Sequence, residues 1–234
     1  MWFFKSSVPI ADSGILHGMT DCHSHLLPGV DDGVKTEEET WRILDEMERQ
    51  GVRKVWLTPH IMEDMPNETA ALQQKFLRLK QKYQGKVELA LAAEYMLDNL
   101  FEERLEKDDL LPLEEGKRYL LVETSYFNPP MGLNNILLRI KTKGYIPVLA
   151  HPERYVYMDE NDYRQLKGLN VRLQLNLFSL VGAYGIGIRK KAEWLLRNSF
   201  YDLAGSDTHC HSIWKEAITK KIQENLSDKL RRFL

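Results

Sequence analysis

Two histidines separated by one residue, His23 and His25, stand at the end of a short apolar run, and Asp32 follows shortly after them. In a β-strand, side chains at positions i and i+2 point to the same side. Both imidazoles would therefore face one site, with a carboxylate near enough to join them. Neutral imidazole and carboxylate together are typical metal ligands.

Similar residues recur wherever an apolar run ends. Six of the seven predicted strands end in a residue that could bind a metal, and the sixth in the chain ends in Asn176, which is a poor ligand. The candidates beyond the first pair and Asp32 are His60, Glu94, Glu123, His151, Asp207 and His209.

Each candidate alone has a simpler explanation. A histidine at a strand end is more often a hydrogen-bonded polar residue, Glu94 could be a loop carboxylate, and Asp32 could serve the Asp-Asp-Gly turn. Glu123 differs, because a carboxylate inside a core strand is costly unless it is paired or binds a metal. His17 and His211 lie off the pattern and are expected to be structural. The joint placement of the other candidates at strand ends predicts a metal site.

The donor set indicates which ions are plausible. It combines imidazole with carboxylate and lacks a thiolate, which suits Mn, Fe, Zn or Mg better than a structural thiolate zinc. Cys22 should point away from His23 into the core, and Cys210 is not expected to be a ligand. Nine candidates exceed the needs of one ion and suffice for two or three divalent ions that share bridging carboxylates.

Elements of a parallel sheet must position these residues. Short runs rich in Val, Leu and Ile alternate with amphipathic helical segments, which predicts an α/β fold with a parallel sheet, open or closed into a barrel. No glycine-rich phosphate loop follows the first strand, so a nucleotide-binding open sheet is not supported. The predicted strands are Met19–Leu26, Lys54–His60, Val87–Tyr95, Tyr119–Thr124, Ile146–His151, Val171–Leu177 and Tyr201–Ser206.

Five helices are predicted between and after these strands. Thr36 and Glu39 form an expected capping box for the first helix, which Gly51 ends. The others are expected from about Asn67 to Gly85, around Leu133 to Gly144, over about 188–198, and from near Ser212.

Composition narrows the class of protein. The chain has 234 residues, a net charge of −2 and 43% hydrophobic residues, which predicts one folded domain over 1–234 with its core at about 19–225. The charge argues against bulk-charge binding to nucleic acid or a membrane. Two cysteines fit a reducing compartment, no apolar run approaches the ~20 residues of a membrane span, and residues 1–5 do not make a signal peptide. We expect a cytoplasmic protein.

Taken together, the motifs resemble the PHP (polymerase and histidinol phosphatase) superfamily, and within it the CpsB/YwqE-type bacterial protein-tyrosine phosphatases of capsule and exopolysaccharide operons. The segments that carry the resemblance occur in family order over residues 21–209: DCHSHLLPGVDDG from Asp21, TPH ending at His60, Ala93-Glu94, HPERY from His151, and GSDTH ending at His209.

The resemblance implies a distorted (β/α)7 barrel with three metals, often manganese. One metal would take His23, His25, Glu94 and Asp207; a second would share Glu94 and take Glu123 and His151; the third would take Asp32, His60 and His209. Arg154 would bind the substrate phosphate, and Asp207 or His209 could assist the leaving group. The implied substrate is phosphotyrosine on protein, for which a bacterial tyrosine kinase is the expected partner.

Two departures from the family pattern affect substrate recognition. The branch often has a second phosphate-binding arginine after the Ser-Asp-x-His segment, yet residues 208–217 contain none, and only His211 and Lys215 could substitute. The segment after His60 is unusually acidic.

Other functions therefore stay open at this point. They are a histidinol-phosphate-type small-molecule phosphatase, a TatD-like metal-dependent nuclease, and a non-catalytic module that binds a kinase. His60 and the Asp31-Asp32-Gly33 turn favour the PHP pattern over the nuclease.

Overall fold

A computed structural model describes residues 6–114 and 118–233. The opening residues, from which we predict no signal peptide, lie outside these ranges. Within them, no helix is both long enough and apolar enough to cross a membrane.

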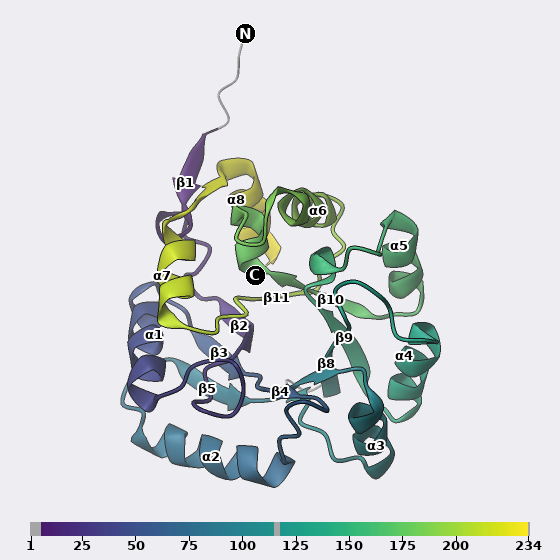
Figure 1. Cartoon of the computed structure of the whole chain (residues 1–234). Coiled ribbons are helices and arrows are strands. Elements are labelled where there is room, and N and C mark those ends of the chain that lie inside the picture. Colours follow the sequence, from purple (N-terminus) through teal and green to yellow (C-terminus); the bar gives the residue numbers. More distant parts are fainter. Residues whose placement is uncertain (1–5, 115–117, 234) are drawn as a thin grey trace.

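Parallel strands in two sheets form the framework (Figure 1). The smaller sheet has the order β2-β3-β5 and the larger has the order β11-β10-β9-β8-β6-β4. All pairings along these two orders are parallel. The strands are β2 (Thr20–Ser24), β3 (Lys54–Leu57), β4 (His60–Ile61), β5 (Glu88–Leu91), β6 (Glu94–Met96), β8 (Arg118–Glu123), β9 (Ile146–Ala150), β10 (Arg172–Asn176) and β11 (Leu203–Gly205).

Backbone hydrogen bonds connect the two sheets at one side, and the chain itself connects them at the other. The amide of Asp207 donates to the carbonyl of His23 at 2.7 Å, and the amide of His25 donates to the carbonyl of Thr208 at 3.0 Å. On the other side, the chain passes directly from β3 to β4 and from β5 to β6. The strands therefore curve around a common centre, with helices outside them (Figure 1).

All seven predicted strand regions contain strand, but two of them are divided. The region 54–60 breaks between β3 and β4 at Thr58 and Pro59. Proline has no N–H for the ladder, and the Thr58 hydroxyl accepts a hydrogen bond from the Ser24 amide at 3.1 Å instead. The region 87–95 breaks between β5 and β6 at Ala92 and Ala93.

The five predicted helices are present with shifted ends. They are α1 (Glu37–Arg49), α2 (Thr69–Lys82), α4 (Leu133–Thr142), α6 (Ile186–Arg197) and α7 (His211–Thr219).

Two predicted helix starts differ in detail from the expectation. Helix α2 begins after Asn67, because the Asn67 side chain donates to the carbonyls of Val30 and His60 and holds that segment in the loop. The Thr36 hydroxyl caps α1 by accepting from the Glu39 amide, but the Glu39 carboxylate accepts from the amide of His211, so the capping box is half formed.

Several elements were not predicted from the sequence. They include helices α3 (Asn99–Lys107), α5 (Glu160–Gly168) and α8 (Glu224–Phe233), and strand β1 (Ser7–Pro9), which pairs antiparallel with β12 (Lys221–Gln223). The remaining short elements are β7 (Leu113–Glu114), which pairs with β8, and the 3₁₀ turns η1 (Ile10–Asp12), η2 (Pro152–Arg154) and η3 (Leu177–Val181).

Buried apolar side chains form two clusters. The larger one lies between the strands and the helices and contains most of the core. The smaller one, which we term the apolar layer, consists of Cys22, Trp56, Ala92, Leu113, Leu121, Val148 and Ala150. Cys22 is thus a core residue, as predicted.

Candidate metal centre

The carboxylate of Glu94 contacts four imidazoles where β6 begins. Its Oε2 lies 3.0 Å from His23 Nε2, 3.3 Å from His25 Nε2 and 3.2 Å from His60 Nδ1. Its Oε1 lies 3.0 Å from His151 Nε2. All five side chains are buried. Glu94 is therefore placed to bridge more than one cation.

Asp207, which follows β11, faces the same two histidines of β2 as Glu94 does. Its Oδ1 lies 3.4 Å from His23 Nε2 and 3.3 Å from His25 Nε2. Its Oδ2 points the other way and accepts hydrogen bonds from Arg154 Nη1 at 2.8 Å and Asn176 Nδ2 at 3.0 Å. One carboxylate thus joins the imidazole cluster to the arginine.

Glu123 at the end of β8 joins His60 and His151. Its Oε1 lies 3.2 Å from His60 Nδ1, and its Oε2 lies 3.9 Å from His151 Nε2.

Asp32 and His209 form the solvent side of the cluster. Asp32 Oδ1 lies 3.3 Å from His209 Nε2 and 3.6 Å from His60 Nε2, and the Asp32 side chain is 60% exposed. A ligand or substrate can therefore approach from this side.

The structure brings all nine candidates into one continuous cluster. Three overlapping sets have ligand atoms within 4.8 Å of one another: His23, His25, Glu94 and Asp207; His60, Glu94 and Glu123; and His25, Asp32, His60 and His209. The first set has the same members as the first metal group implied by the resemblance. In the second set His60 takes the place of His151, and in the third His25 is added.

Nitrogen atoms in this cluster face one another in a way that favours a cation. Nε2 of His23 and Nε2 of His25 are 3.1 Å apart. The buried Nδ1 of His60 makes no hydrogen bond to any described residue, although two carboxylates lie within 3.2 Å of it. Lone pairs that converge without donors are satisfied by a metal ion, so the residues fit divalent metals.

Opposite charges shift the pKa values strongly inside the cluster. Burial lowers the pKa of His23, but the carboxylates of Glu94 and Asp207 outweigh it and raise the value to about 9. Burial raises the pKa of Glu94, but the nearby His23 and His60 lower it well below its usual value. The hydrogen bond from His209 lowers the pKa of Asp32 to about 2. In the absence of a metal, protons on the imidazoles would balance the carboxylates.

Two polar residues outside the cluster orient the imidazoles of His23 and His25. Gln174 Oε1 lies 3.0 Å from His23 Nδ1, and Asp31 Oδ2 lies 2.8 Å from His25 Nδ1. Both partners accept from Nδ1–H, which leaves each Nε2 free to bind a metal. Sequence reasoning missed these roles, although a glutamine inside a buried strand required a partner.

Asn176 was set aside in the sequence as a poor ligand. Its Nδ2 donates to Asp207 and also to the hydroxyl of Tyr184 at 3.0 Å. It therefore holds a candidate ligand in place without binding a metal itself.

The backbone at the site includes two closely packed glycines and two residues with positive φ. A Cβ on Gly205 would lie 2.5 Å from the Cβ of His23, and one on Gly33 would lie 2.2 Å from the His25 carbonyl oxygen. His151 and Asp207 have φ values of 34° and 53°, in the left-handed region that costs energy for residues other than glycine. Strain of this kind is often concentrated at functional sites.

The expected substitutes for the absent arginine behave differently from one another. His211 Nε2 lies 2.9 Å from Glu46 Oε1 and its amide donates to Glu39, so this histidine connects α7 to α1. This agrees with the structural role predicted for it. Lys215 is exposed on α7.

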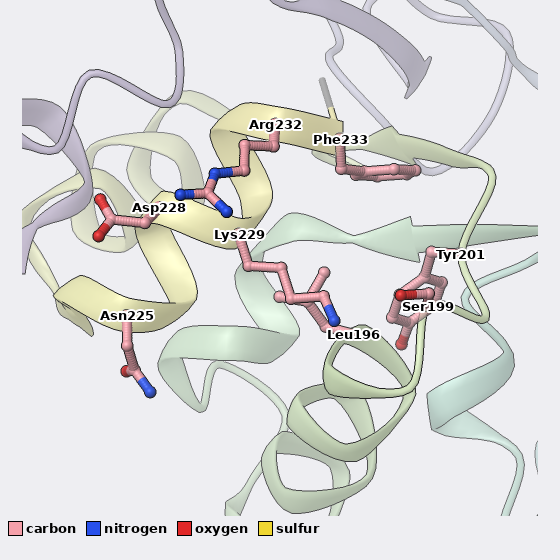
Figure 2. Close-up of a pocket in the computed structure, with 8 residues that line it drawn as sticks. All are labelled: Leu196, Ser199, Tyr201, Asn225, Asp228, Lys229, Arg232 and Phe233. Carbon is pink, nitrogen blue, oxygen red and sulfur yellow. The ribbon is translucent and has the colours of Figure 1, made fainter.

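A separate pocket lies between α6 and α8 (Figure 2). Its lining includes Leu196, Tyr201, Lys229 and Phe233 and none of the nine candidates. The site is therefore identified by its chemistry and not by this hollow.

Comparisons with known proteins identify the family of the chain. The family model for capsular polysaccharide synthesis proteins CpsB/CapC matches residues 19–230. The chain is 34% identical over 210 residues to tyrosine-protein phosphatase CpsB of Streptococcus pneumoniae, covering 82% of this chain and 83% of that protein. It is 29% identical over 197 residues to tyrosine-protein phosphatase YwqE of Bacillus subtilis (strain 168), covering 82% and 77%.

Solved structures agree with the fold. A crystal structure from work on YwqE of Bacillus subtilis and CpsB of Streptococcus pneumoniae, described as unique metal-dependent tyrosine phosphatases, matches with a TM-score of 0.77 and 25% identity over 91% of this chain and 85% of that one. A phosphotriesterase homology protein of Escherichia coli shares the fold at a TM-score of 0.54 and 15% identity, over 92% of this chain and 91% of that one. The chain belongs to the CpsB/CapC family.

Proposed function

We propose that this protein is a metal-dependent phosphatase that hydrolyses phosphotyrosine on proteins. The observation that carries the proposal is the cluster of nine imidazole and carboxylate side chains at the strand ends, in a chain of the CpsB/CapC family. Relatives in this family are named tyrosine-protein phosphatases. A phosphatase of this kind needs no cysteine nucleophile.

The nine cluster residues would hold two or three divalent ions, and manganese is the first candidate. When bound, such ions lower the pKa of water to make it a nucleophile and neutralise the phosphoryl oxygens. Glu94, placed among four imidazoles, would be shared between ions. The proposed ligands are His23, His25, Asp32, His60, Glu94, Glu123, His151, Asp207 and His209.

Arg154 would bind the phosphate beside the metals. Its guanidinium lies at the edge of the cluster through its ion pair with Asp207, and its side chain is 17% exposed, so part of it reaches the solvent. Positive charge placed beforehand next to the phosphoryl oxygens stabilises the charge that moves during transfer.

Help to the leaving group can be modest. A tyrosine phenol has a pKa of about 10 and leaves readily. Asp207 uses Oδ2 for Arg154 and Asn176, and His209 Nδ1 lies 2.9 Å from the Asp207 carbonyl oxygen. Of the two predicted assistants, His209 lies nearer the solvent, but its Nε2 faces Asp32 and would be occupied when it binds a metal, so its help to the leaving group would be indirect.

We further propose a (β/α)7 barrel, in which β3 with β4 and β5 with β6 each count as one strand, over a single domain. The biological setting we propose is dephosphorylation of a bacterial tyrosine kinase that controls capsule or exopolysaccharide synthesis, in the cytoplasm. Two cysteines, Cys22 and Cys210, are too few for a disulfide framework, which fits a reducing compartment.

Turnover of a phosphotyrosine peptide by chelated protein supplied separately with Mn, Fe, Zn and Mg tests the proposal. We expect no activity without metal, recovery with at least one ion, and full activity in the Cys22→Ser and Cys210→Ser variants. Histidinol phosphate and single-stranded DNA serve as competing substrates. Preference for either, or full activity in metal-free protein, would reject the proposal, as would peptide binding without turnover in saturating manganese.

A further inference from the structure

The guanidinium of Arg154 lies between two tyrosine rings. Its Cζ is 4.3 Å from the ring centroid of Tyr126 and 4.4 Å from that of Tyr184. Tyr126 belongs to the loop after β8, whereas Tyr184 lies between η3 and α6. Two segments far apart in the chain thus meet at one side chain.

This arrangement leaves the hydrogen-bonding edge of the arginine available. Aromatic rings attract a cation through their π faces and use none of its N–H groups. A guanidinium carries five N–H donors. Within the described part of the chain, the Arg154 side chain makes one hydrogen bond, from Nη1 to Asp207 at 2.8 Å. The other donors can serve an anion.

Both rings are anchored by the framework of the metal site. The Tyr184 hydroxyl accepts from Asn176, whose amide group also donates to Asp207. Tyr126 stacks on Tyr155 with a centroid separation of 6.1 Å. Its ring centroid also lies 5.8 Å from that of His151. The rings can therefore fix the guanidinium relative to the ligands.

We propose that Tyr126 and Tyr184 are positioning residues that orient Arg154 for the substrate phosphate. They allow a single arginine to bind the phosphate in a chain that has no arginine in residues 208–217. The inference rests on the proposed function, because it names how that site recognises the phosphate group. Both tyrosines act through Arg154.

Binding of inorganic phosphate to the manganese-loaded full chain tests the inference by calorimetry. We expect Tyr126→Leu and Tyr184→Leu each to weaken phosphate binding about three- to thirtyfold, the range for loss of one cation–π contact. Tyr126→Phe keeps the ring and should stay within about twofold. Bound manganese should be unchanged in all of them. With a phosphotyrosine peptide, KM should rise while kcat stays within about threefold.

A double-mutant cycle separates positioning from a general structural effect. In an Arg154→Ala background, Tyr184→Leu should cause no further loss of phosphate affinity. Arg154→Lys keeps the positive charge but lacks the planar group that stacks on the two rings. It should weaken phosphate binding as much as the Leu variants do. It therefore tests the inference even if the Leu variants fold poorly. Tyr83→Leu removes a ring that stacks on Trp41 away from the site and should leave phosphate affinity unchanged.

Equal losses from Tyr184→Leu with and without Arg154 would overturn the inference, as would unchanged affinity in both Leu variants or no phosphate binding by the parent protein. Failure of the proposed function gives a different result. The parent protein would then bind phosphate, with the expected cycle, but would not turn over the phosphotyrosine peptide.

Discussion

The apolar layer and the metal-ligand cluster are built from the same strands, a few residues apart. On β8, Leu121 belongs to the apolar layer and Glu123 to the cluster, and alternation along the strand places both on one face. Ala92 of the apolar layer lies in the break between β5 and β6, two residues before Glu94. Position along the strand, and not the choice of strand, separates the two regions.

The two regions make opposite contributions to folding. Burial of the apolar layer is favourable by about 25 cal/mol per Å² of apolar surface. Seven of the nine cluster residues are buried, within a few ångströms of like and unlike charges. Burying ionisable groups in this way costs free energy unless a cation or a proton balances them. The apolar layer therefore supports a cluster whose own stability depends on cations, and variants in the two regions should fail differently.

Glu94→Gln should have the largest effect on activity. It removes the negative charge that four imidazoles share, so we expect turnover to fall more than about 100-fold, beyond the usual effect of changing an outer partner of a metal ligand. Metal analysis should show fewer bound ions. Cys22→Ala in the apolar layer is the control and should keep its metal. If both variants behaved alike, the division between the regions would be wrong.

Leu121→Ala should instead reduce the free energy of unfolding. Removing a fully buried leucine costs about 2–5 kcal/mol through lost burial and the cavity left behind. Denaturant unfolding of metal-free protein measures this. Metal content at saturation should stay normal, and loss of metal without loss of stability would contradict the comparison.

Gln174→Met should show an intermediate effect at the border of the two regions. It removes the acceptor that orients His23 through Nδ1, and outer partners of this kind change metal affinity about 10–100-fold. Competition with a chelator gives the affinity. Gln165→Met, an exposed change on α5, should leave metal affinity unchanged, and equal affinities in both variants would exclude the orienting role.

Metal affinity should depend on pH in a defined direction. The pKa of His23 in the metal-free protein is raised to about 9, so this imidazole carries a proton at pH 7, and a metal must displace it. Affinity for manganese should rise with pH up to about 9, by up to about tenfold per unit for each proton released. Calorimetry in buffers of different ionisation enthalpy counts the protons. Constant affinity between pH 6 and 9 would show that metal binding displaces no proton from His23.

The metal-ligand cluster was predictable because its residues follow apolar runs directly. His23 lies near the end of β2, Glu94 opens β6 shortly after β5 ends, and Asp207 follows β11. Their convergence follows from parallel strands whose carboxyl ends meet at one edge. Which residues would share each metal ion was less predictable. His60 lies within reach of Glu94 and Glu123 because the chain bends at Pro59 and starts a new short strand.

The supporting residues could not be assigned from their positions alone. Asn176 and Gln174 mark a polar face on β10, but their partners come from distant segments. The role of Glu39 at α7 depends on tertiary packing, which overrode a good local capping signal. Helices α3 and α5 were missed although Asp98 and Asp159 cap them with side-chain hydrogen bonds.

The hydrogen bond between the amide of Asp207 and the carbonyl of His23 has a consequence for biosynthesis. The two residues come from opposite ends of the chain, so a nascent polypeptide has its first histidines long before the last aspartate leaves the ribosome. Contacts between such distant segments form slowly because a long loop must close first. Complete metal loading is therefore a late event, and a chain stopped before residue 207 cannot assemble the full ligand set.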